Sequence, residues 1–333
     1  MPGPIAFRPS SPSPEMASAR LRCFLPVRYL RAAGWECEVF EPSAWQRYRA
    51  VVLQKAYAEE DLTLADCLRA HGIRVIFDLC DNHFYVPTDR PDLRERANRL
   101  RRMIDRADAV SVCTNELARH VGRPSTVIDD ALDEIAPGWL APWQRTCRTI
   151  LARCWRKRFQ LVWFGNAGLD SPPFGLIDLA RLVPVLNELD RHVPLSLTVI
   201  SNSRDAFVRH LAGARFPTRY REYHTHSVQG LLQAHDVCVI PVSPNPFTLS
   251  KTINRPALAL LLGVPVVADA IPSYEDLRPF ILMGSWRNHL SRYAQDHDLR
   301  QHHVEAGRHY LRQRYTPQNV VEQWSKFLTP LLA

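Results

Sequence analysis

The stretch that most constrains the fold runs from Cys238 to Asp269 and alternates apolar segments with a polar loop. Residues 237–241 are apolar and predict a short strand, whereas residues 253–262 predict a helix. Gly263 ends this helix, and residues 264–268 predict a second buried strand. A strand, a helix and a strand in this order indicate one unit of a parallel sheet.

The rest of the chain repeats this alternation. Further strands are expected at 36–40, 50–53, 74–77, 109–112, 126–128, 159–164, 195–200 and 218–222. Helices are expected at 16–33, 58–71, 90–106, 114–121, 174–189, 204–212, 227–235 and within 290–333. The expected fold class is α/β, with two Rossmann-like domains whose parallel sheets face a central cleft.

Length and charge set further bounds. The 333 residues predict two domains, at 1–150 and 151–305, with a final helix at 306–333 that packs back on the first domain. The net charge of +8 favours anionic partners such as nucleotide phosphates or lipid head groups, and no nucleic-acid-binding module is evident. The eight cysteines form no CxxC pair and no signal peptide is visible, so we expect a cytoplasmic protein.

The polar loop before the helix at 253–262 is a candidate phosphate site. A helix start offers unpaired N–H groups and the positive end of the helix dipole. Lysine and arginine add full charges, and hydroxyl groups add hydrogen bonds. The candidate residues are Thr248, Ser250, Lys251, Thr252, Asn254 and Arg255. The alternative for Arg255 is an ion pair with a carboxylate of the 275–276 segment.

A second candidate site follows the strand at 74–77. Asp78, Asp81 and His83 lie at its carboxyl end, where functional groups usually lie in open α/β sheets. The alternative is that these side chains cap the next element and contact water.

Two turns of the second domain are weaker candidates. Gly165, Asn166 and Gly168 follow a strand, and glycine permits a close approach of ligand to backbone, although a plain tight turn is nearly as plausible. Asn202 and Arg204 follow the next strand and either contact a ligand or cap a surface helix. His224 and His226 alternate as in a metal site, but no third ligand is evident, which favours a structural role.

These features together resemble the nucleotide-sugar glycosyltransferases of the GT-B fold, in particular the bacterial members of families one and four. The resemblance is carried by the strand, loop and helix that end in Gly-Val-Pro-Val-Val at 263–267. It implies a hexosyltransferase that needs no metal or other cofactor and takes the sugar nucleotide as a substrate. Asp78, Asp81 and His83 would then address the acceptor, with Asp81 or His83 as base and Lys251 aiding catalysis. The residues at 165–168, 202, 204 and 248–255 would bind the donor.

One departure from the family concerns a Glu-x7-Glu pair that holds the donor sugar and ribose. Its two positions fall on Ser250 and Leu258, and neither is acidic. Two alternatives therefore stay open: a non-catalytic sugar-nucleotide-binding or scaffold protein, and a sugar-nucleotide epimerase of the same fold.

Two basic segments, at 94–106 and 145–158, indicate a surface for anionic lipid, although a solvated charged face is the simpler interpretation. Peripheral contact with the inner face of a membrane would suit a lipid-linked or polysaccharide-precursor acceptor.

Overall fold

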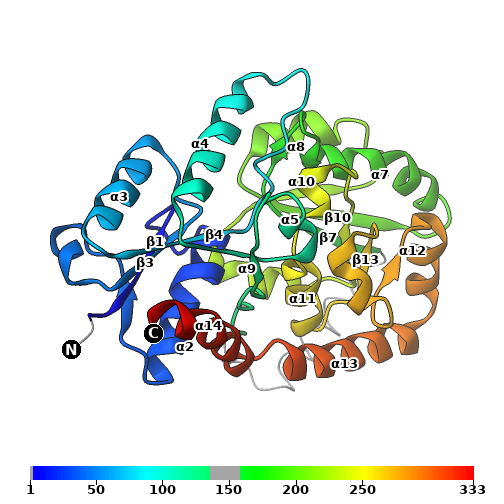
Figure 1. Ribbon diagram of the computed structural model, residues 1–333. Helices are drawn as coiled ribbons and strands as arrows, with labels where there is room; N and C mark the ends of the chain where they lie inside the picture. The colour runs from blue at the N-terminus through cyan, green and yellow to red at the C-terminus, as the bar shows by residue number, and fades with distance from the viewer. Residues whose placement is uncertain (1–2, 136–157) are drawn as a thin grey trace. The chain divides into compact units, whose positions relative to one another are not determined.

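The computed structural model describes residues 3–135 and 158–333 and divides into two compact units (Figure 1). Unit 1 comprises residues 1–132, 245–252 and 312–333, and unit 2 comprises residues 133–244 and 253–311. The segment 245–252 therefore belongs to unit 1, although the residues on both sides of it belong to unit 2. The sequence-based division assigned this segment to the second domain, because its contacts with residues more than a hundred positions away leave no local pattern.

Unit 1 contains a six-stranded parallel sheet with the strand order β2-β1-β3-β4-β5-β6. The strands are β1 (Ile5–Pro9), β2 (Cys37–Val39), β3 (Ala50–Gln54), β4 (Arg74–Leu79), β5 (Ala109–Val112) and β6 (Thr126–Val127). The central strands β3 and β4 are almost wholly buried, as expected for a parallel sheet with both faces covered.

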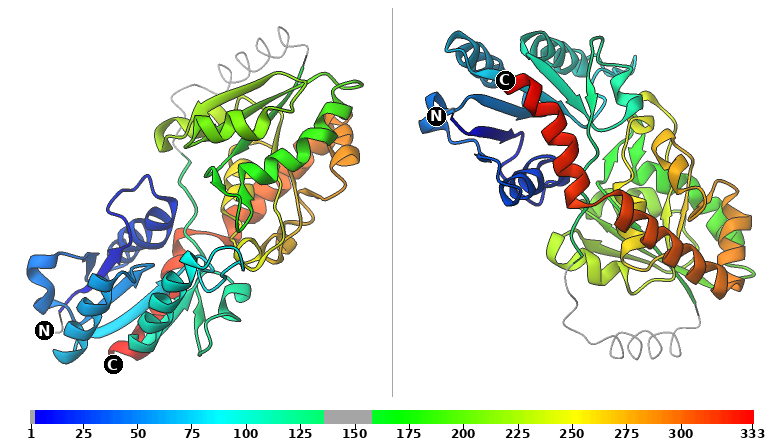
Figure 2. Two further views of the ribbon diagram at one scale, coloured as in Figure 1. Left: turned by 90° about the horizontal axis from the view of Figure 1, so that it is seen from above. Right: turned by 60° about the horizontal axis from the view of Figure 1, so that its bottom comes forward.

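Helices cover both faces of this sheet (Figures 1 and 2). The helical elements of unit 1 are α1 (Ala17–Ala19), η1 (Arg20–Phe24), α2 (Leu25–Ala32), η2 (Pro42–Arg47), α3 (Glu59–Ala70), α4 (Asp92–Arg106), α5 (Asn115–Ala118), α10 (Pro246–Leu249) and α14 (Pro317–Leu332). Side chains of α3 and α4 share one core with β3 and β4. On the other face, Trp324 of α14 is fully buried and packs edge-on against Phe7 of β1, with ring centroids 5.2 Å apart.

The first helical segment contains a π-helix, η1. The Leu25 N–H bonds to the carbonyl oxygen of Arg20, five residues earlier. Pro26 follows directly and has no N–H to offer the carbonyl of Arg22, so the regular α-helical ladder is interrupted at this point. The sequence analysis expected one continuous helix over 16–33.

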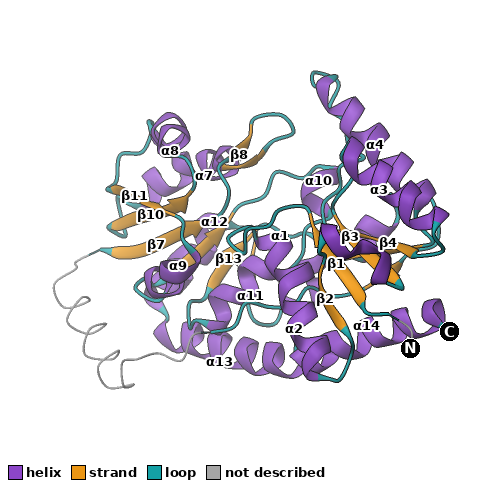
Figure 3. Cartoon of the chain, turned by 90° about the vertical axis from the view of Figure 1, so that its left-hand side faces the viewer, coloured by secondary structure: helices purple, strands orange, loops and turns teal. Residues whose placement is uncertain are grey.

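Unit 2 contains a second six-stranded parallel sheet, ordered β11-β10-β7-β12-β13-β14 (Figure 3). Its strands are β7 (Phe159–Phe164), β10 (Leu195–Ser201), β11 (Thr218–Glu222), β12 (Val237–Ile240), β13 (Val266–Ala268) and β14 (Leu282–Met283). The helical elements of this unit are α7 (Leu176–Leu189), α8 (Arg204–Leu211), α9 (Thr225–Leu232), α11 (Asn254–Leu261), η3 (Pro272–Leu277), α12 (Trp286–Gln295) and α13 (His297–Arg314), whose last turn enters unit 1.

A short antiparallel hairpin follows β7 and was not expected from the sequence. It pairs β8 (Gly168–Leu169) with β9 (Phe174–Gly175). A β-carbon on Gly168 would lie 1.8 Å from the carbonyl oxygen of Phe174, and the φ of this glycine is +81°. Glycine is therefore required at 168 by the close approach of the chain to itself.

Candidate functional site

The candidate site in unit 1 is built at the carboxyl ends of β3 and β4. These strands are parallel neighbours, with Gln54 opposite Asp78, so the residues that follow them emerge at the same edge. Lys55 follows β3, and Asp81, Asn82 and His83 follow β4 within a few residues. Lys55 has a φ of +52°, a left-handed conformation that is uncommon for a residue with a side chain.

Asp81 lies between two lysine ammonium groups. Lys55 Nζ is 2.7 Å from Asp81 Oδ2, and Lys251 Nζ forms an ion pair with Oδ1. The Asp81 side chain is 14% exposed, that of Lys55 is 18% exposed and that of Lys251 is 37% exposed. Burial opposes ionisation of Asp81, but Lys251 and Lys55 outweigh burial and hold the pKa of Asp81 well below its usual range. Asp81 is therefore a permanent carboxylate and a weak base.

His83 lies beside this pair and between two aromatic rings. Its Nδ1 is 2.5 Å from the hydroxyl oxygen of Tyr57, and its ring is stacked with Phe247 at a centroid distance of 6.1 Å. The ammonium group of Lys251 lies 4.0 Å from the centroid of the same Phe247 ring. Burial, reinforced by nearby cations, lowers the pKa of His83 to about 3. The imidazole is therefore neutral at pH 7.

The segment 245–252, which carries Lys251, is held in unit 1 by side-chain hydrogen bonds. Asn82 Nδ2 donates to the carbonyl oxygen of Pro246 at 3.0 Å and to Ser250 Oγ at 3.3 Å. Thr114 Oγ1 donates to the carbonyl oxygen of Ser250 at 3.1 Å. These contacts fix the backbone directly before Lys251.

This arrangement changes the roles expected for the hydroxyl groups of the segment. Thr248 is 3% exposed and exchanges hydrogen bonds with Asn245, which caps α10. Ser250 is 1% exposed and donates to the carbonyl oxygen of Pro246 at 2.8 Å. Thr252 Oγ1 donates to Asp130 at 2.9 Å. These three hydroxyl groups hold the segment in place, which leaves Lys251 as its exposed polar group.

Asp78 also takes a structural role. It is fully buried, and both of its carboxylate oxygens pair with the buried guanidinium of Arg22. Ser111 Oγ donates to Asp78 at 2.7 Å, and Arg22 also contacts Asp130 at 3.2 Å. A carboxylate enclosed in this way has no oxygen left for an acceptor hydroxyl, so the role expected for Asp78 is better assigned to its neighbours.

In unit 2, Arg255 lies at the carboxyl end of β7. Its guanidinium carbon is 5.1 Å from the ring centroid of Trp163, and a β-carbon on Gly165 would lie 3.6 Å from it. The Nε and Nη2 atoms of Arg255 are buried, yet neither makes a hydrogen bond within the described residues. The ion pair considered as an alternative for Arg255 does not form with Glu275, which pairs with Arg278. Two buried guanidinium nitrogens without hydrogen bonds make Arg255 a candidate for contact with an anionic ligand.

The turn at 165–168 is organised by asparagine side chains. The Ala167 N–H donates to Asn202 Oδ1, and the Gly168 N–H donates to Asn166 Oδ1, both at 2.8 Å. Arg204 is exposed at the start of α8, which Ser203 caps. Asn166 and Asn202 thus shape the turn beside Arg255, while Asn254 opens helix α11, on which Arg255 lies.

The other predicted features lie elsewhere. The His224 and His226 rings stack at 5.3 Å, and the described residues contain no group of three or more histidine, cysteine or acidic side chains that could hold a metal ion. In the part of the chain that the structure describes, no helix has the length and apolar character needed to cross a bilayer. The basic segment at 145–158 lies, except for Arg158, outside the described residues.

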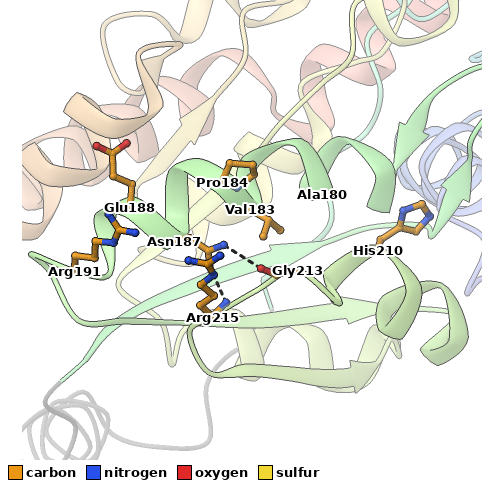
Figure 4. A pocket seen from close by; sticks show the side chains of 9 residues that line it. All are labelled: Ala180, Val183, Pro184, Asn187, Glu188, Arg191, His210, Gly213 and Arg215. Atoms are coloured by element: carbon orange, nitrogen blue, oxygen red, sulfur yellow. Dashed lines mark hydrogen bonds between the residues drawn. The ribbon is translucent and has the colours of Figure 1, made fainter.

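A pocket of about 510 Å³ lies between α7 and the segment that follows α8 (Figure 4). Asn187 lines it and bonds both to the carbonyl oxygen of Gly213 at 3.0 Å and to the N–H of Arg215 at 2.7 Å. The pocket contains none of the residues singled out from the sequence, and the polar groups of Asn187 are satisfied. We therefore place the candidate site at the strand ends instead.

Comparisons with known proteins identify the fold. No model of a protein family and no curated protein sequence matches the chain. A solved glycosyltransferase from Rickettsia africae ESF-5 aligns over 99% of both chains with a TM-score of 0.66 and 10% identity. WaaG, a glycosyltransferase involved in lipopolysaccharide biosynthesis, aligns over 92% of this chain and 94% of its own with a TM-score of 0.60 and 14% identity.

A third similar structure is that titled trehalose-6-phosphate from E. coli, bound with UDP-2-fluoro glucose. It covers 85% of this chain and 73% of its own, with a TM-score of 0.57 and 13% identity. At these identities the likeness establishes the fold. The α/β class and the GT-B fold expected from the sequence are thereby confirmed.

Several functional candidates were missed by the sequence analysis. Lys55, Tyr57 and Asn82 had no assigned role, and Arg22 was read only as part of a helix. Lys55 and Asn82 each follow a buried strand within three residues, which is the signal that singled out Asp81 and His83. Arg22 has no such signal, because its importance depends on a contact 56 positions away.

Proposed function

We propose that this protein is a glycosyltransferase that moves a sugar from a nucleotide-sugar donor to the hydroxyl group of an acceptor. The observation that carries the proposal is Arg255, whose buried guanidinium lies unsatisfied at the carboxyl end of β7 beside the glycine turn. A diphosphate is the group that such a planar fork of donors binds best. The GT-B fold supplies the context in which that diphosphate belongs to a sugar nucleotide.

In the proposed reaction, the acceptor oxygen forms a bond to the anomeric carbon of the sugar, and the bond from that carbon to the diphosphate oxygen breaks. The acceptor loses its hydroxyl proton, and the nucleoside diphosphate leaves with an added negative charge. Arg255, which lies beside the 165–168 turn, stabilises this charge in unit 2. Fixed cations of this kind act on the transition state without reorganisation. We therefore propose that the reaction needs neither a metal nor another cofactor.

We propose that unit 1 holds the acceptor. Both carboxylate oxygens of Asp81 are engaged by Lys55 and Lys251, so we do not assign Asp81 to receive the acceptor proton. His83 is neutral at pH 7, and its Nε2 makes no hydrogen bond within the described residues. His83 is therefore the group we assign to receive the hydrogen bond of the acceptor hydroxyl.

A membrane-bound precursor is the acceptor we favour, because α4 presents an uneven distribution of charge. Arg102 and Arg106 of this helix pair with carboxylates of α3, whereas Arg94 and Arg101 are exposed and make no ion pair in the described part of the chain. Exposed arginines on an amphipathic helix attract anionic head groups. A flotation assay with vesicles containing phosphatidylglycerol tests this point. Binding should weaken in an Arg94→Ser, Arg101→Ser variant and persist in Arg69→Ser.

The decisive experiment for the activity is calorimetric titration of UDP-, GDP-, TDP- and CMP-sugars. One of these sugar nucleotides should bind. At a concentration of about a hundred times its dissociation constant, it should raise the free energy of unfolding by roughly 2.7 kcal/mol. Arg255→Gln should lose this binding by about tenfold or more, as expected for one charge-assisted contact. Arg278→Gln, which removes an exposed arginine paired with Glu275, is the matched control.

The outcomes separate the proposal from its rivals. Release of free nucleoside diphosphate in the presence of acceptor supports a transferase. Conversion of the donor sugar with no acceptor present would indicate an epimerase. Binding without turnover would indicate a sugar-nucleotide-binding protein, consistent with the buried, non-acidic Ser250 and Leu258. Absence of binding in folded protein would overturn all three.

A further inference from the structure

Unit 1 carries more positive than negative charge around His83. The imidazole and the adjacent Tyr57 hydroxyl both lie within electrostatic reach of Lys55 and Arg96, and His83 also of Lys251. Asp81 is the carboxylate that acts on both rings. Three cations therefore surround a neutral histidine, and one carboxylate balances them in part.

Arg96 differs from the other arginines of its helix because one of its guanidinium nitrogens is buried without a hydrogen bond. Arg99, Arg102 and Arg106 each pair with an acidic side chain, the last two at 2.7 and 2.9 Å. Arg96 makes no ion pair within the described residues, and its Nε is buried without a hydrogen bond. A buried N–H of a guanidinium is costly to leave unsatisfied, so this side chain lacks a partner that a ligand would supply.

Lys55 and Lys251 keep donors available despite their contact with Asp81. An ammonium group has three N–H donors, and each lysine has one assigned contact with an Asp81 oxygen. Both lysine side chains remain partly exposed, and Lys55 adopts a left-handed backbone conformation to lie there. Strained backbone at a strand end is typical of functional positions.

We propose that Lys55, Arg96 and Lys251 form a phosphate-binding cluster beside His83, and that the acceptor of the proposed transferase carries this phosphate. The inference rests on the activity proposed above and names the class of its acceptor: a phosphorylated sugar or a phosphate-linked lipid. A tetrahedral dianion suits two ammonium groups that meet at Asp81 and a guanidinium within electrostatic reach of the same imidazole. Asp81 occupies part of the cationic surface in the absence of ligand.

The cluster also couples acceptor binding to His83. Burial is the main cause of the neutral imidazole and the three cations reinforce it, so a bound dianion offsets the part that comes from their charge. The basicity of His83 therefore rises when the phosphate is in place. Binding of the acceptor phosphate would in this way increase the ability of His83 to take the proton of the acceptor hydroxyl group.

The test compares probes with and without phosphate. Inorganic phosphate, glucose 6-phosphate and glucose are titrated into the full chain by calorimetry. Phosphate and glucose 6-phosphate should bind and glucose should not. Lys55→Met and Arg96→Met should each weaken phosphate binding by about tenfold or more, the loss expected for one charge-assisted hydrogen bond. Arg69→Met, an exposed arginine of α3, should leave it unchanged within about twofold.

Two further measurements guard against variants that merely misfold. Asp81→Asn removes the competing carboxylate and should tighten phosphate binding, a gain that damage to the fold would not produce. NMR titration of the His83 ring, assigned with His83→Gln, should show its pKa rising when inorganic phosphate is added. If Asp81 and the two lysines form only a structural ion pair, neither the tighter phosphate binding nor the rise in the pKa of His83 is expected.

The binding measurements distinguish the two sources of the phosphate, and they show which of the two proposals fails. Tighter binding of glucose 6-phosphate than of inorganic phosphate supports a free sugar phosphate, whereas competition by phosphatidylglycerol vesicles supports a lipid-linked acceptor. Loss of UDP or other nucleoside diphosphate binding in Lys55→Met would assign the cluster to the donor and overturn the inference. Nucleotide-sugar binding through Arg255 with no phosphate binding would overturn the inference alone. Phosphate binding with no nucleotide-sugar binding would overturn the acceptor assignment together with the transferase.

Discussion

Asn82 Nδ2 donates a hydrogen bond to the carbonyl oxygen of Pro246 at 3.0 Å, and the two residues are 164 positions apart in the chain. The bond joins the loop after β4 to the helix α10, whose carboxyl end leads to Lys251. Asp81 and His83 flank Asn82 in sequence. One side chain thus fixes the relative position of the lysine on one segment and the carboxylate and imidazole on another.

We expect Asn82→Ala to loosen the segment 245–252. The substitution removes the donor to Ser250 Oγ and one of the two donors to the Pro246 carbonyl oxygen, which should lower the free energy of unfolding by about 1–3 kcal/mol. Limited proteolysis should then cleave this segment faster. Asn98→Ala, which changes an exposed asparagine of α4, is the control. Equal proteolysis of both variants would show that the segment is held by its other contacts.

The ion pairs of Arg22 with Asp78 and Asp130 should contribute strongly to the free energy of unfolding. Arg22 is 1% exposed and Asp78 is fully buried, so removal of Arg22 leaves the Asp78 carboxylate buried without a cation. Arg22→Met should lower the free energy of unfolding by about 3–5 kcal/mol. The Arg22→Met, Asp78→Asn double variant should lose less than the sum of the single variants, as measured by urea unfolding. Additive losses would show that the two side chains act independently.

The fold was largely predictable because the strands of a buried parallel sheet are apolar and short. Residues 237–241 and 264–268 flank a helix that Gly263 ends, and the structure has β12, α11 and β13 at these places. The hairpin of β8 and β9 was missed because each of its strands has two residues, too few for a periodic pattern.

The candidate site was predictable in location but not in detail. Asp81 and His83 were singled out because they follow a strand, and the same rule applies to Lys55. The burial of Asp78 was not foreseen, because it depends on pairing with an arginine 56 positions away in the chain. Likewise the hydroxyl groups at 248 and 250 look available in the sequence, and only the fold shows that they are enclosed.

Ser250 offers a test of whether its non-acidic character is required by the structure. This serine occupies a position where the resembled family has glutamate, but here it is 1% exposed and bonded to Pro246 and Asn82. Ser250→Glu would bury a carboxylate without a basic partner, so we expect a loss of several kcal/mol in the free energy of unfolding. Ser250→Ala should cost about 1 kcal/mol. A folded Ser250→Glu protein with increased donor turnover would show that this position accepts the glutamate of the resembled family.

The pH dependence of stability should report the environment of His83. Burial, aided by Arg96, Lys55 and Lys251 against Asp81, lowers the pKa of His83 to about 3, whereas the unfolded residue has a pKa of about 6.5. Between these values the unfolded chain binds a proton that folded His83 does not. The free energy of unfolding therefore falls as the pH is lowered from about 6.5 toward 3, by at most about 1.4 kcal/mol per pH unit from this group.

Urea unfolding at a series of pH values should show a shallower fall for His83→Gln than for the wild type. His297→Gln, which removes an exposed histidine, is the control. Identical pH profiles for the wild type and His83→Gln would show that the fold does not lower the pKa of this imidazole.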